Sequence, residues 1–385
     1  MKKIKKRFSQ FKIIFTYIVA LFIRNFIKKY NDVWLISERG DEARDNGYAF
    51  YLYLKKVHPE INIKYIITKN SYDKERIEGD DIIFKYSFKN YIAFLNSKYL
   101  ISTHVMGCSP EFGMFGKLDN LGLVFTRGKR IFLQHGVIYN YLPSLVNKKI
   151  DLFITSSNIE KEFVIKKFNY NKKIVKCTGL ARYDDLYFNE SKNYILVMPT
   201  WRSYLYYSNK NDFIKSTYFN KWNSFLKNKK LNRILEERKI KLIFYPHYES
   251  QRFLDCYKLN NNIILASAEK YDIHNLLKEC SVFVTDYSST SFDIAYMHKP
   301  LLYYAFDYDE FYSKHYDKGY LDIKENYFGT FCSNEDYLIK CLEKIIMKNF
   351  KNEIKFTKNE EKFFLYFDAN NCERIFKEIN KLKGI

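Results

Sequence analysis

The sequence predicts an α/β fold with two Rossmann-like domains and a basic amphipathic helix at the N-terminus. Short apolar strands alternate with helices from residue 31 onward, and the alternation restarts near residue 191. Strands and helices at this spacing are typical of parallel βαβ units. A basic and apolar segment precedes both domains. We therefore expect three parts, which are residues 1–30, 31–190 and 191–385.

The individual elements follow from the position of each apolar run. In the first domain we expect strands at residues 32–38, 63–68, 81–86, 99–104, 129–136, 151–157 and 174–179, with helices at 49–59, 90–98 and 159–168. In the second we expect strands at 193–201, 241–247, 262–266, 281–289 and 300–307, a helix at 274–281 and a helical tail from residue 334. No low-complexity linker separates the halves, so we expect them to share a cleft, with ligands at the carboxyl ends of the strands.

Composition excludes some classes of protein. The 385 residues are 47% hydrophobic, which is too apolar for a disordered chain. The net charge of +20 fits either a nucleic-acid-binding protein or one that handles phosphorylated substrates at an anionic membrane. Residues 1–30 carry nine Lys or Arg residues and no acid. Because this charge lies beside an apolar segment and no nucleic-acid motif is present, we favour the membrane and expect no nucleic-acid partner.

The apolar segment Phe11–Ile23 is shorter than the 20 or so residues that a transmembrane helix needs. No signal-peptide cleavage site follows it. We expect a helix on an anionic membrane surface, and the alternative is a first helix packed on the domain. The seven scattered cysteines form no CxxC pair, which indicates neither zinc nor disulfides and favours a reducing compartment. Together these features predict a peripheral protein on the cytoplasmic face of the membrane.

In the first domain, polar residues follow the predicted strands. His135 and Gly136 end an apolar strand, where a histidine opens onto a cleft and can take a proton from a hydroxyl. A hydrogen-bonded structural histidine is the alternative. Glu38, Asp45 and Asn46 lie between a strand and a helix, where they either contact an acceptor or cap the helix and solvate the loop. For Asp45 and Asn46 the structural role is the stronger interpretation.

In the second domain, a hydroxyl series begins a helix directly after a buried strand. Ser288, Ser289 and Thr290 follow Asp286, and such a helix start binds phosphate or is capped by Asp286 or Ser288. No GxGxxG or GxxxxGKS loop is present. Two further predicted strands of this domain end near Arg202 and His247. An arginine and a histidine at such positions suit the binding of a diphosphate. Taken alone, Arg202 is more often part of an ion pair.

Taken in order, these pieces resemble the CDP-glycerol glycerophosphotransferase family, which includes primases and polymerases of teichoic acids and related capsule enzymes. The resemblance spans residues 32–340 or so and rests on the motifs SERGDEARDN, LQHG, TGLARYD, PTWR, a PH pair after a strand, TDYSSTSFD and KPLLYYAFD. Each motif alone is weak, and the combination is fairly specific. Family members are similar to glycosyltransferases of the GT-B type, whose two Rossmann-like domains face each other across a cleft.

The resemblance implies a donor, an acceptor and a reaction. The donor is CDP-glycerol, the acceptor is a hydroxyl of a membrane-linked or capsular glycan, and CMP is released. His135 is then the general base, and Gly136 and Arg182 join the acceptor side. The implied donor-binding residues are Arg202, His247, Asp286, Ser288, Ser289 and Thr290. No cofactor is implied and we expect no required metal, since the D-Y-D of Asp307 and Asp309 is the only candidate pair after a strand.

The sequence also departs from the family pattern. Ala181 stands where the family more often has Pro, and Val137 follows His135-Gly136 where many members carry Thr-Pro. The second difference leaves the acceptor and the donor polyol open. A CDP-ribitol ribitolphosphotransferase and a GT-B glycosyltransferase that uses a nucleotide sugar are therefore the alternatives.

Overall fold

The computed structural model describes residues 2–315, 317–325 and 327–382, which form two compact units. The first unit contains residues 2–135, 143–184 and 368–382, and the second contains residues 136–142 and 185–367, always within the described part. Met1 of the predicted 1–30 segment lies outside the described residues. So do the side chains of residues 2–9, which include Lys2, Lys3, Lys5, Lys6 and Arg7.

The first unit is built on a parallel sheet of seven strands in the order β3-β2-β1-β4-β5-β6-β7. The strands are β1 (Trp34–Ser37), β2 (Ile63–Ile67), β3 (Ile82–Phe84), β4 (Tyr99–Ser102), β5 (Lys129–Phe132), β6 (Leu152–Thr155) and β7 (Val175–Cys177). The register places Trp34 opposite Ile63 on one side and opposite Tyr99 on the other. The strand order reverses between β1 and β4, which is where open α/β sheets bind ligands.

Seven α-helices accompany this sheet in the described residues. They are α1 (Lys2–Ile23), α2 (Asn46–Val57), α3 (Phe88–Asn96), α4 (Phe112–Asn120), α5 (Asn158–Phe168), α6 (Tyr183–Leu186) and α15 (Asn371–Lys381). Side-chain caps begin two of the predicted helices, because Ser87 accepts from the Asn90 amide and Ser157 from the Glu160 amide. The predicted strands and helices of this half are all found, and α4 and α6 were not predicted.

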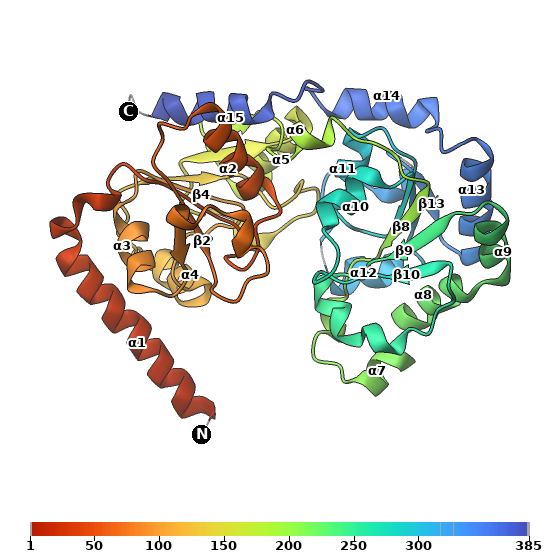
Figure 1. Cartoon of the computed structure of the whole chain (residues 1–385), viewed down its shortest axis with the longest axis horizontal. Coiled ribbons are helices and arrows are strands. Elements are labelled where there is room, and N and C mark those ends of the chain that lie inside the picture. The colour runs from red at the N-terminus through yellow and green to blue at the C-terminus, as the bar shows by residue number, and fades with distance from the viewer. Residues whose placement is uncertain (1, 316, 326, 383–385) are drawn as a thin grey trace. The chain divides into compact units, whose positions relative to one another are not determined.

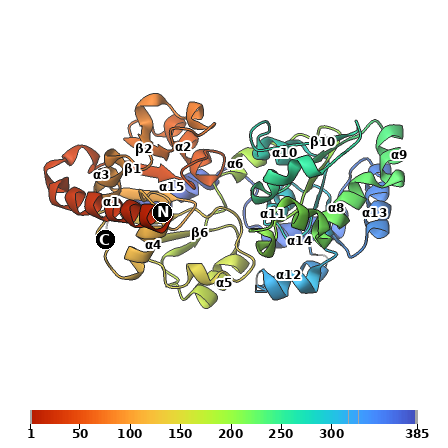
Figure 2. The ribbon, with the colours of Figure 1, turned by 90° about the horizontal axis from the view of Figure 1, so that it is seen from below.

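The N-terminal helix α1 has a buried face and also exposes apolar side chains. Tyr17 and Ala20 are buried in a core cluster with Phe115, and α1 lies next to α3 (Figures 1 and 2). The Tyr17 hydroxyl donates to the Leu123 carbonyl and accepts from the Phe125 amide. Other apolar side chains of α1 are exposed, namely Phe11, Ile14, Phe15, Ile18 and Phe22. In the described part of the chain, no helix is both long and apolar enough to span a membrane.

The second unit has a parallel sheet of six strands in the order β10-β9-β8-β11-β12-β13. The strands are β8 (Tyr194–Met198), β9 (Lys241–Phe244), β10 (Ile263–Leu265), β11 (Val282–Thr285), β12 (Leu301–Tyr304) and β13 (Thr330–Cys332). Its strand order reverses between β8 and β11. The two parallel sheets confirm the predicted pair of Rossmann-like α/β folds, and β13 was not predicted.

The helices of the second unit are α7 (Lys210–Lys215), α8 (Thr217–Lys227), α9 (Lys229–Glu237), α10 (Ile273–Glu279), α11 (Thr290–Tyr296), α12 (Tyr308–Lys314), α13 (Glu335–Met347) and α14 (Ile354–Phe363). The core of this unit is rich in aromatic residues and centres on Trp222, which contacts Phe225, Phe244 and Tyr304. The high aromatic content of the chain therefore serves packing in large part.

The compact units differ from the predicted domain boundaries in two ways. The segment 136–142, which follows His135, belongs to the second unit. The final helix α15 belongs to the first unit, where it packs on α2 and β6, although we expected the C-terminal helices in the second domain. Asp184 explains this return, because its carboxylate accepts from the backbone amides of Asn371 and Cys372 at the start of α15.

Candidate functional site

The first candidate site is a histidine–aspartate pair after β5 of the first unit. Nδ1 of His135 lies 2.7 Å from Oδ2 of Asp45. Gln134 adopts a left-handed φ of 65°, which ends the strand before the histidine. The His135 side chain is 62% exposed, whereas the Asp45 side chain is only 9% exposed. A buried carboxylate therefore holds one ring nitrogen, and the rest of the imidazole is open to solvent.

Arg182 and Asn46 fasten this pair to the fold. Nη1 of Arg182 lies 2.5 Å from Oδ1 of Asp45 and donates to the His135 carbonyl. The Asn46 amide group donates to the Gln134 carbonyl, and its oxygen accepts from the Arg182 backbone amide. Residues from three separate parts of the sequence thus meet at one point. Four of the residues named from the sequence, His135, Asp45, Asn46 and Arg182, are brought together.

Glu38 holds the loop that carries Asp45. Its side chain is buried and accepts from the backbone amides of Arg44, Asp45 and Tyr48. Burial and the nearby Asp45 raise the pKa of Glu38 well above its usual range. Glu38 therefore shapes the loop that presents Asp45, and it does not reach solvent itself. Gly136 follows His135 directly and is the first residue of the short segment that belongs to the second unit.

The contact between His135 and Asp45 shifts the pKa values of the two groups in opposite directions. Desolvation opposes protonation of the imidazole, but the Asp45 carboxylate outweighs it and raises the pKa of His135. Burial alone would raise the pKa of Asp45, yet His135 and Arg182 lower it. With Nδ1–H donated to Asp45, the Nε2 atom is the position that can accept a proton. This is the arrangement of an oriented general base.

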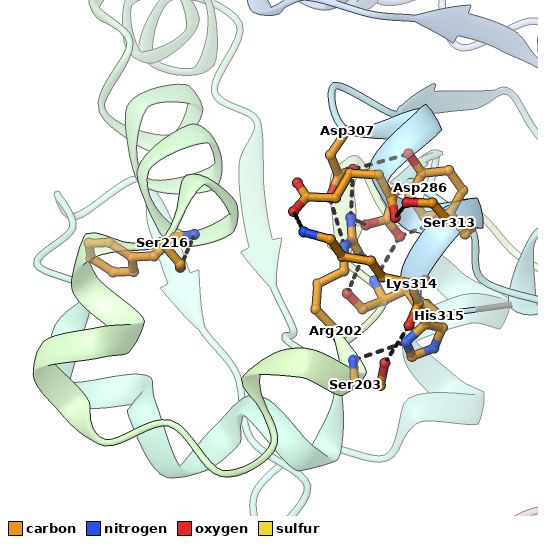
Figure 3. A network of polar contacts seen from close by, with 12 residues as sticks. Arg202, Ser203, Ser216, Asp286, Asp307, Ser313, Lys314 and His315 are labelled. Atoms are coloured by element: carbon orange, nitrogen blue, oxygen red, sulfur yellow. Dashed lines mark hydrogen bonds and ion pairs between the residues drawn. The ribbon is translucent and has the colours of Figure 1, made fainter.

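The second candidate site surrounds Arg202, which follows β8 in the second unit. Its guanidinium is fully buried, and it donates from Nε to Asp307 at 2.8 Å and from Nη2 to Asp286 at 2.9 Å (Figure 3). Nη1 donates to the Thr200 carbonyl, and Tyr287 lies beside the guanidinium face. Direct contact with a diphosphate was expected from the sequence, whereas the structure ties Arg202 to the ends of β8, β11 and β12.

Asp286 and the hydroxyl series follow β11. Asp286 accepts from the backbone amides of Thr200 and Tyr287 as well as from Arg202, so it does not cap α11. The hydroxyls of Ser288 and Thr290 lie 2.8 Å apart. Ser288, Ser289 and Thr290 are all partly exposed. These three residues are therefore partly open to solvent directly after β11.

His247 follows β9 on the same unit. Its ring stacks on Trp201 with centroids 5.9 Å apart, and its Nδ1 accepts from the Glu249 amide. Trp201 also contacts the ring of His315, whose Nδ1 accepts from the Ser203 amide (Figure 3). Burial is the main cause that lowers the pKa of His315 to about 4, and the charge of Arg202 is the second. Trp201, His247 and His315 thus form a cluster of rings near the buried Arg202.

The sequence did not indicate the roles of two residues in these sites, Asp307 and His315. Asp307 was considered only as a metal ligand, yet it pairs with Arg202 and accepts from the Tyr287 hydroxyl. His315 carries no motif and could not be found from the sequence. Asp309 is 94% exposed at the side chain and faces Lys324. Within the described residues, no group of three or more His, Cys, Asp or Glu side chains has the geometry of a metal site.

The sequence of this chain is similar to a described family and to several curated proteins. Residues 17–381 match a family described as CDP-Glycerol:Poly(glycerophosphate) glycerophosphotransferase. The chain is 30% identical over 371 residues to the minor teichoic acid biosynthesis protein GgaB of Bacillus subtilis (strain 168), an alignment that covers 91% of this chain and 40% of GgaB. It thus spans about two fifths of that relative. It is 26% identical to a teichoic acid poly(glycerol phosphate) polymerase of Bacillus spizizenii, covering 89% of this chain and 90% of the polymerase.

Solved structures show the same fold. A structure of the wall teichoic acid polymerase TagF superposes with a TM-score of 0.69 at 15% identity, covering 97% of this chain and 98% of that one. A UDP-N-acetylglucosamine 2-epimerase from Listeria monocytogenes superposes with a TM-score of 0.54 at 15% identity, covering 91% and 96%. The architecture is therefore shared with a wall teichoic acid polymerase and with a UDP-N-acetylglucosamine 2-epimerase.

Proposed function

The chain belongs to the CDP-glycerol:poly(glycerophosphate) glycerophosphotransferase family, and from this premise we propose that it transfers glycerol phosphate from CDP-glycerol to a glycan hydroxyl. The acceptor is a membrane-linked or capsular glycan, and CMP is the second product. The observation that carries the proposal is the His135–Asp45 pair, because it supplies an oriented base for a hydroxyl nucleophile. The relatives named after teichoic acid synthesis support the same reaction class.

The reaction is a phosphoryl transfer. The acceptor oxygen forms a bond to the β-phosphorus of CDP-glycerol, and the bond from that phosphorus to the bridging oxygen of the diphosphate breaks. CMP leaves with the bridging oxygen, and the acceptor proton passes to Nε2 of His135. Asp45 keeps Nδ1 protonated and stabilises the imidazolium that forms. Most of the catalysis in such a reaction comes from positioning and from neutralising charge.

On the donor side, we assign the diphosphate to Ser288, Ser289 and Thr290. Their partial exposure after β11 supports this assignment. Arg202 then acts as a positioning residue, since its buried ion pairs hold Asp286, two residues before Ser288, and Asp307 after β12. His247 stacks on Trp201 and belongs to the same carboxyl edge of the sheet.

The N-terminal helix suggests a membrane partner. Phe11, Phe15 and Phe22 of α1 are 69%, 58% and 76% exposed, and all belong to a segment with basic and no acidic residues. Exposed aromatic side chains with flanking cations suit the boundary between anionic headgroups and acyl chains. We therefore propose that the protein binds the cytoplasmic face of the cell membrane peripherally, where a lipid-linked acceptor is available.

The direct test is release of CMP from CDP-glycerol, with membrane extract as the source of acceptor. CDP-ribitol, a UDP-sugar and CMP-sialic acid are assayed in parallel. We expect acceptor-dependent release from CDP-glycerol and little from the other donors. Release from CDP-ribitol instead would keep the reaction and change the polyol. Release from a sugar nucleotide alone would make the protein a glycosyltransferase and contradict attack at phosphorus.

A further inference from the structure

A second histidine lies beside His135 on the first unit. His104 follows β4 and His135 follows β5, and these strands are parallel neighbours. Both side chains therefore emerge at the carboxyl edge of the sheet, next to the point where the strand order reverses between β1 and β4. The two ring centroids are 5.4 Å apart and the ring planes are tilted by 40°. No sequence motif had singled out His104.

Local contacts fix the orientation of this ring. Its Nδ1 atom lies 3.0 Å from the hydroxyl of Thr103, and its backbone amide donates to the Ser102 hydroxyl. The edge of Phe112 packs against the ring with centroids 6.1 Å apart. Nε2 of His104 has no hydrogen-bond partner among the described residues, and the His104 residue is partly exposed. A held imidazole with one unused nitrogen suits contact with a ligand.

The surroundings of His104 keep it neutral. Burial is the main cause, and the charges of His135 and Arg39 add to it, so that the pKa of His104 falls to about 3. Lys85 lowers this pKa further and Asp45 opposes the decrease. The pKa of His135 is shifted in the opposite direction. Two imidazoles whose proton affinities are separated in this way suit different tasks, one as a proton acceptor and the other as a neutral hydrogen-bond donor.

We propose that His104 binds the acceptor, donating a hydrogen bond from Nε2–H to an acceptor oxygen beside the hydroxyl that His135 deprotonates. We assign the Thr103 hydroxyl as the donor to Nδ1 in this contact, which leaves the ring proton of the neutral imidazole on Nε2. The ligand class is a polyol or polyol phosphate, because such a molecule carries a second oxygen on the carbon next to the one that bears the attacking oxygen. This inference rests on the proposed function, which supplies the hydroxyl acceptor and the role of His135.

The kinetic test compares His104→Ala and His104→Gln with the wild type. For the Ala variant we expect an increase of about tenfold in the KM for the acceptor, which corresponds to the loss of one hydrogen bond. The Gln variant keeps an N–H donor and is expected to recover most of the affinity. The KM for CDP-glycerol should stay unchanged, because the diphosphate is assigned to the second unit. A role in folding alone would instead lower transfer in both variants without a selective change in the KM for the acceptor.

His58→Gln is a matched control, because His58 is a partly exposed histidine of the same unit that stacks on Phe376 at 3.7 Å, away from the pair. We expect its acceptor KM to equal that of the wild type. An unchanged acceptor KM in both His104 variants would overturn the inference. So would an equal increase in the KM for the acceptor and in the KM for CDP-glycerol.

A binding measurement separates this inference from the proposed function. Full-length protein labelled with 13C at histidine Cε1 is titrated with glycerol 3-phosphate and observed by NMR. We expect the signals of His104 and His135 to move together and that of His58 to stay. Movement of these signals without CMP release from CDP-glycerol would refute the proposed reaction and leave the binding role of His104. CMP release without any shift of the His104 signal would refute the binding role alone.

Discussion

The Nδ1 atom of His135 lies 2.7 Å from Oδ2 of Asp45, and this contact joins the loop before α2 to the end of β5. It leaves the opposite edge of an exposed imidazole available to a substrate. The same carboxylate is bound by Arg182, so the position of the histidine is determined by several residues at once.

Replacement of the base should abolish turnover and leave donor binding intact. For His135→Ala we expect a decrease in kcat of about 10²–10⁴-fold, because the attacking hydroxyl then loses its proton acceptor. Affinity for CDP, measured by calorimetry, should match that of the wild type, since the diphosphate is assigned to the second unit. An equal loss of CDP binding and turnover would rule out the role of base.

Asp45→Asn should shift the pH dependence of the reaction. The Asp45 carboxylate raises the pKa of His135, so its removal lowers that pKa. The base is then neutral at lower pH, and the acidic limb of log kcat/KM should move to lower pH while the maximum rate falls. The profile is measured from pH 5 to 9, beside Asp41→Asn as an exposed acidic control. An acidic limb that stays in place would show that Asp45 does not set the proton affinity of His135.

The pair should also make stability depend on pH. Because the pKa of His135 is raised in the folded state, its contribution is complete below the unfolded pKa of about 6.5 and is lost as pH rises through the folded value. The lowered pKa of Asp45 gives a contribution that is present above about 3.9 and lost as pH falls through the folded value. Urea unfolding should therefore separate wild type from His135→Ala more at pH 5.5 than at pH 9. An equal difference at both values would contradict the ion pair.

The strand ends of the second unit should depend on Arg202. Arg202→Met leaves Asp286 and Asp307 buried without their cation, which costs about 3–5 kcal/mol of unfolding free energy. Arg233→Met removes an arginine whose side chain is 68% exposed and should cost less than about 0.5 kcal/mol. Both are measured by urea unfolding. Similar small losses in the two variants would mean that the buried ion pairs do not hold the site together.

The exposed face of α1 should control membrane binding. Deleting residues 1–30 would also remove Tyr17 and Ala20 from the core, so point substitutions are the cleaner test. For Phe15→Ser with Phe22→Ser we expect a loss of at least tenfold in binding to vesicles containing anionic phosphatidylglycerol, because two large apolar side chains no longer enter the bilayer.

Two measurements complete this membrane test. Thermal unfolding of the double variant should be unchanged, since both phenylalanines lie outside the core. Vesicles of zwitterionic lipid alone should bind the wild type more weakly than anionic vesicles do, and salt should reduce the difference. Full vesicle binding by the double variant would contradict a membrane role for this face.

The alternating pattern of apolar runs predicts most of both sheets because buried parallel strands are continuous apolar segments. It misses β13, whose sequence Thr-Phe-Cys contains no aliphatic run and follows an irregular stretch. It also cannot show that α15 joins the first unit, because that depends on capping by Asp184, far away in sequence. Site residues are recognised by type at strand ends. Whether a side chain such as Arg202 points to solvent or to buried carboxylates depends on packing that no motif records.

The most direct test of the central claim follows both parts of the transferred group. CDP-glycerol carrying 32P in the β-phosphate and 3H in the glycerol is incubated with the protein and an acceptor-containing membrane extract, and the products are separated. The account predicts that both labels reach the acceptor in equal amounts and that the released CMP carries no 32P. Formation of 32P-labelled CDP, with only tritium on the acceptor, would mean that a carbon–oxygen bond breaks and would contradict attack at phosphorus.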